Sequence, residues 1–242
     1  MKRSNIKTLS PTHILYEDNH LLIVNKPAGV LVQGDRTGDT PLLDLAKNYI
    51  KEKYSKPGDV FLGVVHRLDR PTSGVIIFAR TSKALSRLND QFKQRSNKKI
   101  YWAIVEGTHA PKEAKLTHWL VRKPTINKSF AYKKEVPNSK EAHLEFHTVK
   151  TLDRYSCLAI DLHTGRHHQI RAQLNAIDLH IKGDLKYGAS RSNPDGSIHL
   201  HAKSISFEHP VKKEWLTIAA PLPKLAPWSA CDADASSPLY AE

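Results

Sequence analysis

The hydrophobic positions of this chain form short apolar runs separated by polar turns, a pattern typical of β-strands. Residues 21–25 read Leu-Leu-Ile-Val-Asn and end at a Lys-Pro-Ala-Gly turn. Two further apolar runs, 61–65 and 75–79, enclose a polar loop. Additional strands are predicted at 100–106, 144–149, 155–162 and 198–207.

Three helices are predicted between these strands. Thr40 is the candidate N-cap of the first helix, which should end at Pro57-Gly58. Ser82 is expected to cap the second helix, and the third should span residues 168–177. Strands with few long helices between them favour an α+β fold with a mixed, largely antiparallel central sheet, flanked by a few helices and loops.

Neither an internal repeat nor a low-complexity linker divides the 242 residues. We therefore expect an N-terminal extension over 1–13 and one domain over 14–228. The segment 229–242 is rich in small, polar and acidic residues, which predicts a disordered tail.

The net charge of +13 results from 37 Lys and Arg against 24 Asp and Glu, which favours a polyanionic partner. One basic cluster comprises Lys93, Arg95, Lys98 and Lys99. A second comprises Arg122, Lys123, Lys128, Lys133 and Lys134 and is interleaved with Phe130 and Tyr132. Lysines and aromatics in such a mixture suit contacts to an RNA backbone and stacking on bases, although a solvated basic surface fits equally well.

Cys157 and Cys231 lie far apart in the sequence, so we expect neither a disulfide framework nor a thiolate metal site. This cysteine usage suits the reducing cytoplasm. The chain has no apolar run near the ~20 residues that span a bilayer, and its basic N-terminus leads into no signal core. We expect a cytoplasmic protein without a membrane partner.

The polar loop between the runs 61–65 and 75–79 reads His-Arg-Leu-Asp-Arg-Pro-Thr-Ser-Gly, residues 66–74. It places Asp69 between Arg67 and Arg70, and neighbouring guanidinium groups favour the ionised carboxylate. An ionised carboxylate on a loop is a plausible nucleophile or electrostatic anchor. A simple loop salt bridge is the alternative.

Two other polar clusters interrupt the apolar framework. In the first, Tyr101 falls on the strand face opposite Ile100 and Trp102, and from this pattern alone a packed strand aromatic is favoured over a catalytic residue. In the second, Gly165 permits a turn into the helix of residues 168–177. Arg171 lies at the edge of that helix's apolar stripe, so its guanidinium needs a carboxylate partner.

Fourteen histidines permit a metal-dependent hydrolase as an alternative, with His163, His167 and His168, or His199 and His201, as candidate ligands. The chain lacks a His-Glu-x-x-His or Cys-x-x-Cys pattern, a phosphate-binding Gly-x-x-x-x-Gly-Lys-Ser/Thr loop and a Gly-x-Ser-x-Gly elbow. Metal binding, ATP-driven chemistry and serine hydrolysis therefore lose support, and we expect no metal.

Four motifs, in their order and spacing, resemble those of the RluA family of pseudouridine synthases. They are His66 to Gly74, Lys99 to Gly107, Thr164 to Arg171 and Gly183 to Gly188. Weaker matches at 14–18, 25–29, 207–210 and 221–223 extend the resemblance over residues 14–223. The family's fold implies an active-site cleft across the sheet, and its reaction needs no cofactor.

The resemblance implies an isomerase that converts specific uridines of structured ribosomal or transfer RNA to pseudouridine. Asp69 resembles the catalytic aspartate, Tyr101 the tyrosine that stacks under the uracil ring, and Arg171 the arginine that pairs with the aspartate. Arg67 resembles the arginine that fills the gap left by the flipped nucleotide. The other residues expected to contact RNA are His66, Arg70, Lys99, Arg166 and His168.

Two segments depart from the family pattern. Ile-Arg-Val-His is replaced by Ile170-Arg171-Ala172-Gln173, and Gly-x-Pro-Ile by Asp178-Leu179-His180-Ile181. Only about thirteen residues precede the first motif, so the small N-terminal S4 domain of many relatives is not expected. A non-catalytic RNA-binding protein on the same fold is the strongest alternative; the joint presence of Asp69, Tyr101 and Arg171 argues against it.

Overall fold

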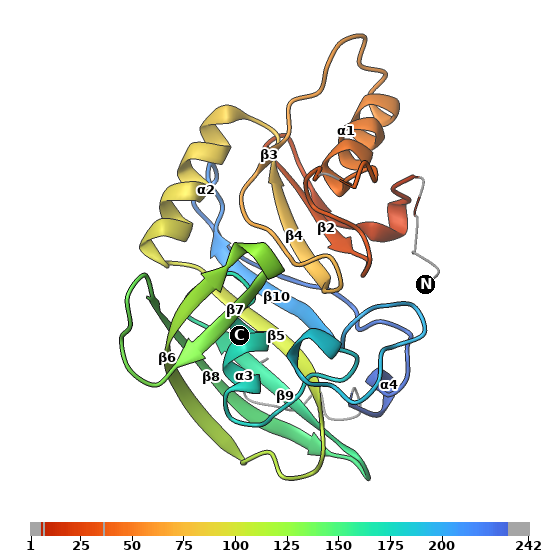
Figure 1. The fold of residues 1–242 in the computed structure, drawn as a ribbon. Helices are drawn as coiled ribbons and strands as arrows, with labels where there is room; N and C mark the ends of the chain where they lie inside the picture. Colours follow the sequence, from red (N-terminus) through yellow and green to blue (C-terminus); the bar gives the residue numbers. More distant parts are fainter. Residues whose placement is uncertain (1–5, 7, 36, 232–242) are drawn as a thin grey trace. The chain divides into compact units, whose positions relative to one another are not determined.

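The structure, a computed structural model, describes residues 6, 8–35 and 37–231 (Figure 1). The chain forms two compact units that interleave in the sequence. Unit 1 comprises residues 1–98 and 202–221, and unit 2 comprises residues 99–201 and 222–242. The sequence-based expectation of a single domain over 14–228 stays a prediction.

The sheet of unit 1 contains the predicted strands at 21–25 and 75–79. Its order is β1 (Ile14–Glu17), β2 (Leu21–Lys26), β4 (Ser73–Ala79) and β10 (Leu200–Glu208), with the two-residue β3 (Gly63–Val64) on β4 and β11 (Trp215–Ala219) on β10. The pairs β1–β2, β2–β4, β3–β4 and β10–β11 are antiparallel. Every residue of β4 is buried, which explains its uninterrupted apolar sequence.

Two helices belong to unit 1, α1 (Leu42–Lys53) and α2 (Ser82–Gln94). Both predicted caps were wrong by one residue. The N-cap of α1 is Pro41, and that of α2 is Thr81, whose hydroxyl accepts a hydrogen bond from the Ala84 N–H at 3.1 Å. The apolar side of α2 packs on one face of the sheet, in a core made by Leu21, Ile23, Val75, Ile77, Ala79, Ala84, Leu88, Ile205 and Phe207.

The sheet of unit 2 has the order β5 (Lys98–Glu106), β9 (Tyr155–Leu162), β8 (Lys140–Thr151), β6 (Glu113–Lys123) and β7 (Lys128–Tyr132), and each of these pairs is antiparallel. The predicted strands at 100–106, 144–149 and 155–162 are confirmed. Strands β6 and β7, joined by the short 3-10 turn Pro124–Ile126, were not predicted. The protein is thus α+β, with largely antiparallel pairing and few helices, as the sequence predicted.

Helix α3 (Gln169–Asn175) packs on β6 and β7, close to the 3-10 turn Leu185–Tyr187. It begins after the predicted residue 168, because His168 adopts a left-handed conformation (φ 53°) at the N-cap, and it ends at Asn175, before the predicted residue 177. Ala172 joins Leu120 and Tyr187 in a small buried cluster between the helix and the sheet.

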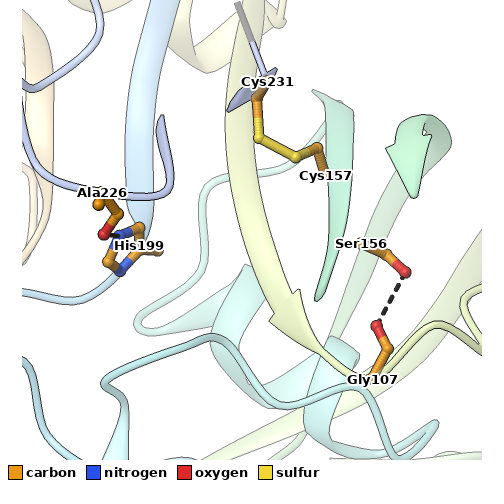
Figure 2. Close-up of a disulfide and its surroundings, with 6 residues drawn as sticks. All are labelled: Gly107, Ser156, Cys157, His199, Ala226 and Cys231. Atoms are coloured by element: carbon orange, nitrogen blue, oxygen red, sulfur yellow. Dashed lines mark hydrogen bonds between the residues drawn. A yellow bond between two sulfur atoms is a disulfide. The ribbon is translucent and has the colours of Figure 1, made fainter. Parts of the chain in front are cut away.

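A disulfide joins Cys157 of β9 to Cys231 of α4 (Trp228–Cys231), with 6.2 Å between the two Cα atoms (Figure 2). The expectation that these cysteines would not pair was therefore wrong. A separation of 74 residues hides the proximity, which arises because the segment before Cys231 returns to β9 and buries Trp228. The disordered tail was predicted over 229–242. It was wrong for residues 229–231, which lie in α4 and end at the buried Cys231, and residues 232–242 lie outside the described residues. Within the described residues, no helix has the length and apolar character to cross a membrane.

Candidate active site

Asp69 lies in the loop that connects β3 to β4. The pairs Gly63–Ala79 and Val64–Phe78 bring the two strands together, so residues 65–72 form the closed end of a hairpin. Within it, the Thr72 N–H donates to the Asp69 carbonyl at 3.0 Å and fixes a turn. Asp69 is partly exposed and Arg67 is exposed, whereas Leu68 between them is buried. The loop therefore anchors itself through Leu68 and presents its charged residues.

The loop is also held from the side by the turn that follows β2. The Arg70 carbonyl accepts hydrogen bonds from the Gly29 N–H at 2.8 Å and from the Lys26 ammonium at 3.2 Å. The Arg70 guanidinium in turn donates to the Gly29 carbonyl at 3.0 Å and forms an ion pair with Asp39. Arg70, the residue next to Asp69, is thus fixed by hydrogen bonds that it both donates to and accepts from the turn after β2.

Lys26 is fully buried beneath this loop. Its ammonium donates to the carbonyls of Pro27, Val30 and Arg70 at 3.1, 2.8 and 3.2 Å. Burial lowers the pKa of Lys26 from 10.5 to about 7, even though the carboxylate of Asp69 acts to raise it. A titratable amine that interacts electrostatically with Asp69 therefore lies inside unit 1, and sequence reasoning did not identify it.

His66, predicted to contact RNA, has partners inside unit 1. Its Nε2 accepts a hydrogen bond from the Ile77 N–H at 3.1 Å, and its ring stacks on Phe92 of α2 with centroids 5.2 Å apart. These contacts tie the start of the loop to β4 and α2. They weigh against direct RNA contact and favour a positioning role.

Gly74 closes the loop at a point where no other residue fits. Its φ is +115°, and a β carbon there would lie 2.3 Å from the Ala202 carbonyl oxygen of β10. Both the backbone conformation and the close approach of β10 require glycine. The local structure of unit 1 therefore explains why the motif has a glycine at this position.

In unit 2, Tyr101 lies in the middle of β5 opposite Ile160 of β9, and only 9% of it is exposed. Ile100, Trp102 and Ile104 share a core cluster on one face of the strand. Tyr101 alternates with them and so faces the other side of the sheet, as the sequence predicted.

Arg171 extends from α3 and is 5% exposed. Its Nε and Nη2 donate to the two carboxylate oxygens of Asp184 at 2.6 and 2.8 Å. The centre of the Tyr187 ring lies 4.9 Å from the guanidinium carbon. Asp184 is thus the carboxylate partner that Arg171 has within unit 2. Asp184 lies within the motif Gly183 to Gly188, and no role for it was predicted from the sequence.

The turn before α3 is held by Gln169. Its side-chain oxygen accepts hydrogen bonds from the Thr164 hydroxyl at 2.8 Å and the Arg166 N–H at 3.0 Å, while its amide donates to the His143 carbonyl at 3.0 Å. The guanidinium of Arg166 donates to the Glu141 carbonyl at 3.1 Å. The turn is therefore bound tightly to β8.

Two other residues with predicted RNA contacts lie at the same turn. The Lys99 ammonium would be 3.9 Å from a β carbon at Gly165, so the second and third motifs meet here. His168 is 7% exposed, and its Nδ1 lies 3.0 Å from the Tyr187 hydroxyl. Its burial favours a packing role over direct contact with RNA.

Both departures from the family pattern fit into unit 2. Gln173 is fully buried, and its amide donates to the carbonyls of Leu116 and Ala142, each at 3.2 Å. His180 lies with its Nδ1 2.9 Å from the Tyr187 carbonyl oxygen. Each replacement side chain thus contacts the backbone of a neighbouring segment.

The candidate metal ligands do not assemble. Among residues 6, 8–35 and 37–231, no three His, Cys, Asp or Glu side chains converge as a metal site. His199 instead accepts a hydrogen bond from the Asn193 amide at 2.9 Å and lies 3.1 Å from the Ala226 carbonyl (Figure 2). Its ring also stacks on Trp228.

A family model described as RNA pseudouridylate synthase matches residues 20–176, more than half of the chain. This chain belongs to the RNA pseudouridylate synthase family. The matched range includes Asp69, Tyr101 and Arg171.

Relatives in this family have names that specify an RNA. "Ribosomal large subunit pseudouridine synthase C" of Vibrio parahaemolyticus is 32% identical over 216 residues, covering 86% of this chain and 65% of that protein. "tRNA pseudouridine synthase C" of Haemophilus influenzae is 33% identical over 227 residues, covering 86% of this chain and 92% of that protein. A pseudouridine synthase of Synechocystis is 34% identical, and this chain spans 66% of its length.

The fold is shared with two human members of the RNA pseudouridylate synthase family. "Human RNA Pseudouridylate Synthase Domain Containing 4" gives a TM-score of 0.72 over 87% of this chain and 88% of that chain, at 23% identity. The human domain-containing protein 1 gives 0.68 over 92% and 89%, also at 23% identity.

Proposed function

We propose that this protein isomerises uridine to pseudouridine in structured RNA, with Asp69 as the group that engages the target nucleotide covalently. The observation that carries the proposal is the setting of Asp69 in a chain of this family. It lies on a partly exposed loop that is fixed by β3, β4 and the β2 turn, above a buried lysine. A nucleophile that is held by its backbone needs little reorganisation before it reacts.

The reaction balances without an outside reagent. The carboxylate of Asp69 attacks either the ribose C1′ or the uracil C6, the bond between C1′ and N1 breaks, and the uracil rotates. A bond between C1′ and C5 then forms, C5 gives up its proton, N1 gains one, and the carboxylate is released. Because no electron is gained or lost overall, the chemistry requires neither a redox cofactor nor ATP.

Tyr101 and Arg171 act on the same uridine in this proposal. A tyrosine ring in a rigid strand can stack under the uracil, and a guanidinium can stabilise an ionised carboxylate. The bidentate contact with Asp184 supports this role because it fixes the orientation of Arg171. Asp184 is then a positioning residue.

The target base must leave its stack, which costs a few kcal/mol. Contacts to phosphates by a chain of net charge +13 can offset this cost, and exposed Arg67 can fill the gap in the RNA. Lys99 and Arg166 are further candidates for RNA contact, since neither is buried. For His66, Arg70 and His168 the observed protein contacts favour positioning.

Ribosomal RNA and transfer RNA are the proposed substrates because the named relatives divide between these two. Such substrates place the protein in the cytoplasm. The disulfide removes the support that unpaired cysteines gave to this location.

The test is a map of pseudouridines in ribosomal and transfer RNA from a strain lacking this protein, compared with its parent. We expect at least one pseudouridine to be absent and to return with the wild-type gene. Asp69→Asn should not restore it, whereas the matched control Asp153→Asn, in an exposed turn, should. Maps that are identical with and without the protein would support the non-catalytic RNA-binding alternative, and restoration by Asp69→Asn would refute the role of Asp69.

A further inference from the structure

The β6–β7 hairpin carries a surface that the proposed chemistry does not use. Strand β7 pairs with β6 and stands at the end of the strand order of unit 2, within the described residues. From Trp119 to Lys134 the sequence contains five Lys and Arg residues and no Asp or Glu. The hairpin is therefore a basic edge of the sheet (Figure 1).

The two faces of this hairpin differ in what covers them. Leu120 and Ala131 pair across the strands and pack with Ala172 of α3 and with Tyr187. The Tyr187 hydroxyl also bonds the backbone N–H and carbonyl of Ser129 at 2.8 and 3.1 Å. The inner face is thus closed by α3 and the turn at Tyr187.

The outer face carries aromatic side chains. Residues directly opposite each other in an antiparallel pair share a face, so the pairs Trp119–Tyr132 and Val121–Phe130 lie side by side on it. Phe130 is 37% exposed and Tyr132 is 42% exposed. We call this surface, made by Trp119, Val121, Phe130 and Tyr132, the aromatic stripe.

Basic residues surround the aromatic stripe. Lys123 and Lys128 form the next cross-strand pair, and the Lys128 ammonium lies 5.5 Å from the centre of the Phe130 ring. At the other end of β7 follow Lys133 and Lys134, both exposed. Aromatic rings next to cations are the combination with which proteins bind unpaired nucleic acid.

The lysines alone could serve to protect the edge strand from pairing with other chains, but this role does not explain the exposed aromatic residues. Lysines on an edge strand discourage pairing with other chains, but exposed aromatic residues would encourage it. Rings that stack on bases, next to cations that contact phosphates, account for both features at once. Acidic residues near the stripe lie beyond the segment 119–134, at Glu135 and at Glu141 of β8, which pairs with Trp119, so the segment itself keeps a basic character.

We propose that the aromatic stripe binds an unpaired segment of the RNA substrate by stacking on its bases. This inference extends the proposed function, since it assigns a second RNA contact outside the residues that act on the uridine. Such a contact would hold the RNA through bases that need not be uridine, and would contribute to the choice of target.

The test uses the full chain and a fluorescein-labelled oligoadenylate of about 12 nucleotides, with binding followed by fluorescence anisotropy. This probe has no uridine, so its binding does not depend on the isomerase activity. Phe130→Ala/Tyr132→Ala should weaken binding by roughly 5- to 100-fold. The matched control Phe61→Ala/Trp215→Ala removes two exposed aromatics from unit 1 and should leave binding within about twofold.

Two further variants separate stacking from charge and from misfolding. Phe130→Leu/Tyr132→Leu keeps the apolar packing and should bind as weakly as the alanine variant, because the rings are missing. Lys133→Gln/Lys134→Gln should lower the salt dependence of binding by about 1.4 in slope, whereas Lys51→Gln/Lys56→Gln on exposed positions of unit 1 should not.

Unchanged affinity in both aromatic variants would overturn the proposal. An equal loss of affinity for a duplex RNA of the same length would also overturn it, because paired bases cannot stack on the rings. Concentration-dependent dimerisation that is lost in Phe130→Ala/Tyr132→Ala, without RNA binding by the wild type, would assign the surface to contact between copies of this chain. If oligoadenylate binds as expected but no uridine is isomerised, only the proposed function fails.

Discussion

Replacing Asp184 by asparagine should destabilise the protein strongly. The substitution keeps the size of the side chain but removes the negative charge that receives two hydrogen bonds from Arg171, at 2.6 and 2.8 Å. The side chains are 5% and 1% exposed, so water contributes little to screening the guanidinium. The buried positive charge would lose much of its compensation.

The magnitude follows from the burial of the pair. Removing one partner of a buried ion pair typically costs about 3–5 kcal/mol of unfolding free energy. An exposed ion pair contributes at most about 1 kcal/mol. Lys115 and Glu145 form such a pair in the same sheet at 3.1 Å, with side chains 81% and 44% exposed. Glu145→Gln is therefore the matched control, with the same chemical change in a different environment.

The assay is urea unfolding of wild type, Asp184→Asn and Glu145→Gln at pH 7, followed by tryptophan fluorescence and by circular dichroism. We expect a loss of roughly 3 kcal/mol for Asp184→Asn and below about 1 kcal/mol for Glu145→Gln. The double variant Arg171→Met/Asp184→Leu should be more stable than Asp184→Asn, because it removes both charges. Equal small losses in the two single variants would refute the reasoning.

Three other predictions concern groups that the structure buries. Burial and the charge of Lys182 lower the pKa of His199 from 6.5 to about 4. The neutral ring therefore stabilises the protein by about 3 kcal/mol above pH 6.5, and this contribution is lost as the pH falls to 4. In urea titrations, the stability difference between wild type and His199→Asn should be smaller at pH 4.5 than at pH 7. The pKa of Lys26 is also lowered, from 10.5 to about 7, so the stability that Lys26 gives the wild type rises with pH over that range. The loss of unfolding free energy in Lys26→Met relative to wild type should therefore grow by about 3 kcal/mol between pH 7 and 9.5. A loss that does not change with pH would contradict the burial of a neutral amine. The disulfide closes a loop of 74 residues, so Cys157→Ser/Cys231→Ser should lower the free energy of unfolding by up to about 4 kcal/mol under oxidising conditions. Under reducing conditions the variant and the wild type should be equally stable.

Two kinds of strand could be predicted from the sequence: those buried throughout, such as β4, and those with alternating burial, such as β8. The run at 75–79 consists of apolar residues because every position of β4 is covered, and such a run has few other interpretations. Strand β7 escaped prediction because its outward positions are Lys128, Phe130 and Tyr132, which read as a basic aromatic surface cluster. The segment is both a basic aromatic cluster and a β-strand, because the cluster lies on the outer face of the strand.

The candidate site was predictable where its residues are adjacent in sequence. Asp69 and its loop could be predicted from a polar run between two apolar runs. The alternation in β5 predicts which face of the sheet carries Tyr101. The contacts of Lys26 with Arg70 and of Arg171 with Asp184 span 44 and 13 residues, and no periodicity connects them. The disulfide eluded prediction for the same reason, since sequence spacing does not show which segments meet.

The most direct test of the account is the release of tritium from RNA that carries uridine labelled at C5, because forming the new bond at C5 must displace that hydrogen. The purified wild-type protein should release tritium from a ribosomal or transfer RNA transcript that the strain comparison identifies, and Asp69→Asn should bind the same transcript with similar affinity yet release none. Tritium release by Asp69→Asn at a rate comparable to wild type would contradict the central claim that this carboxylate carries the chemistry.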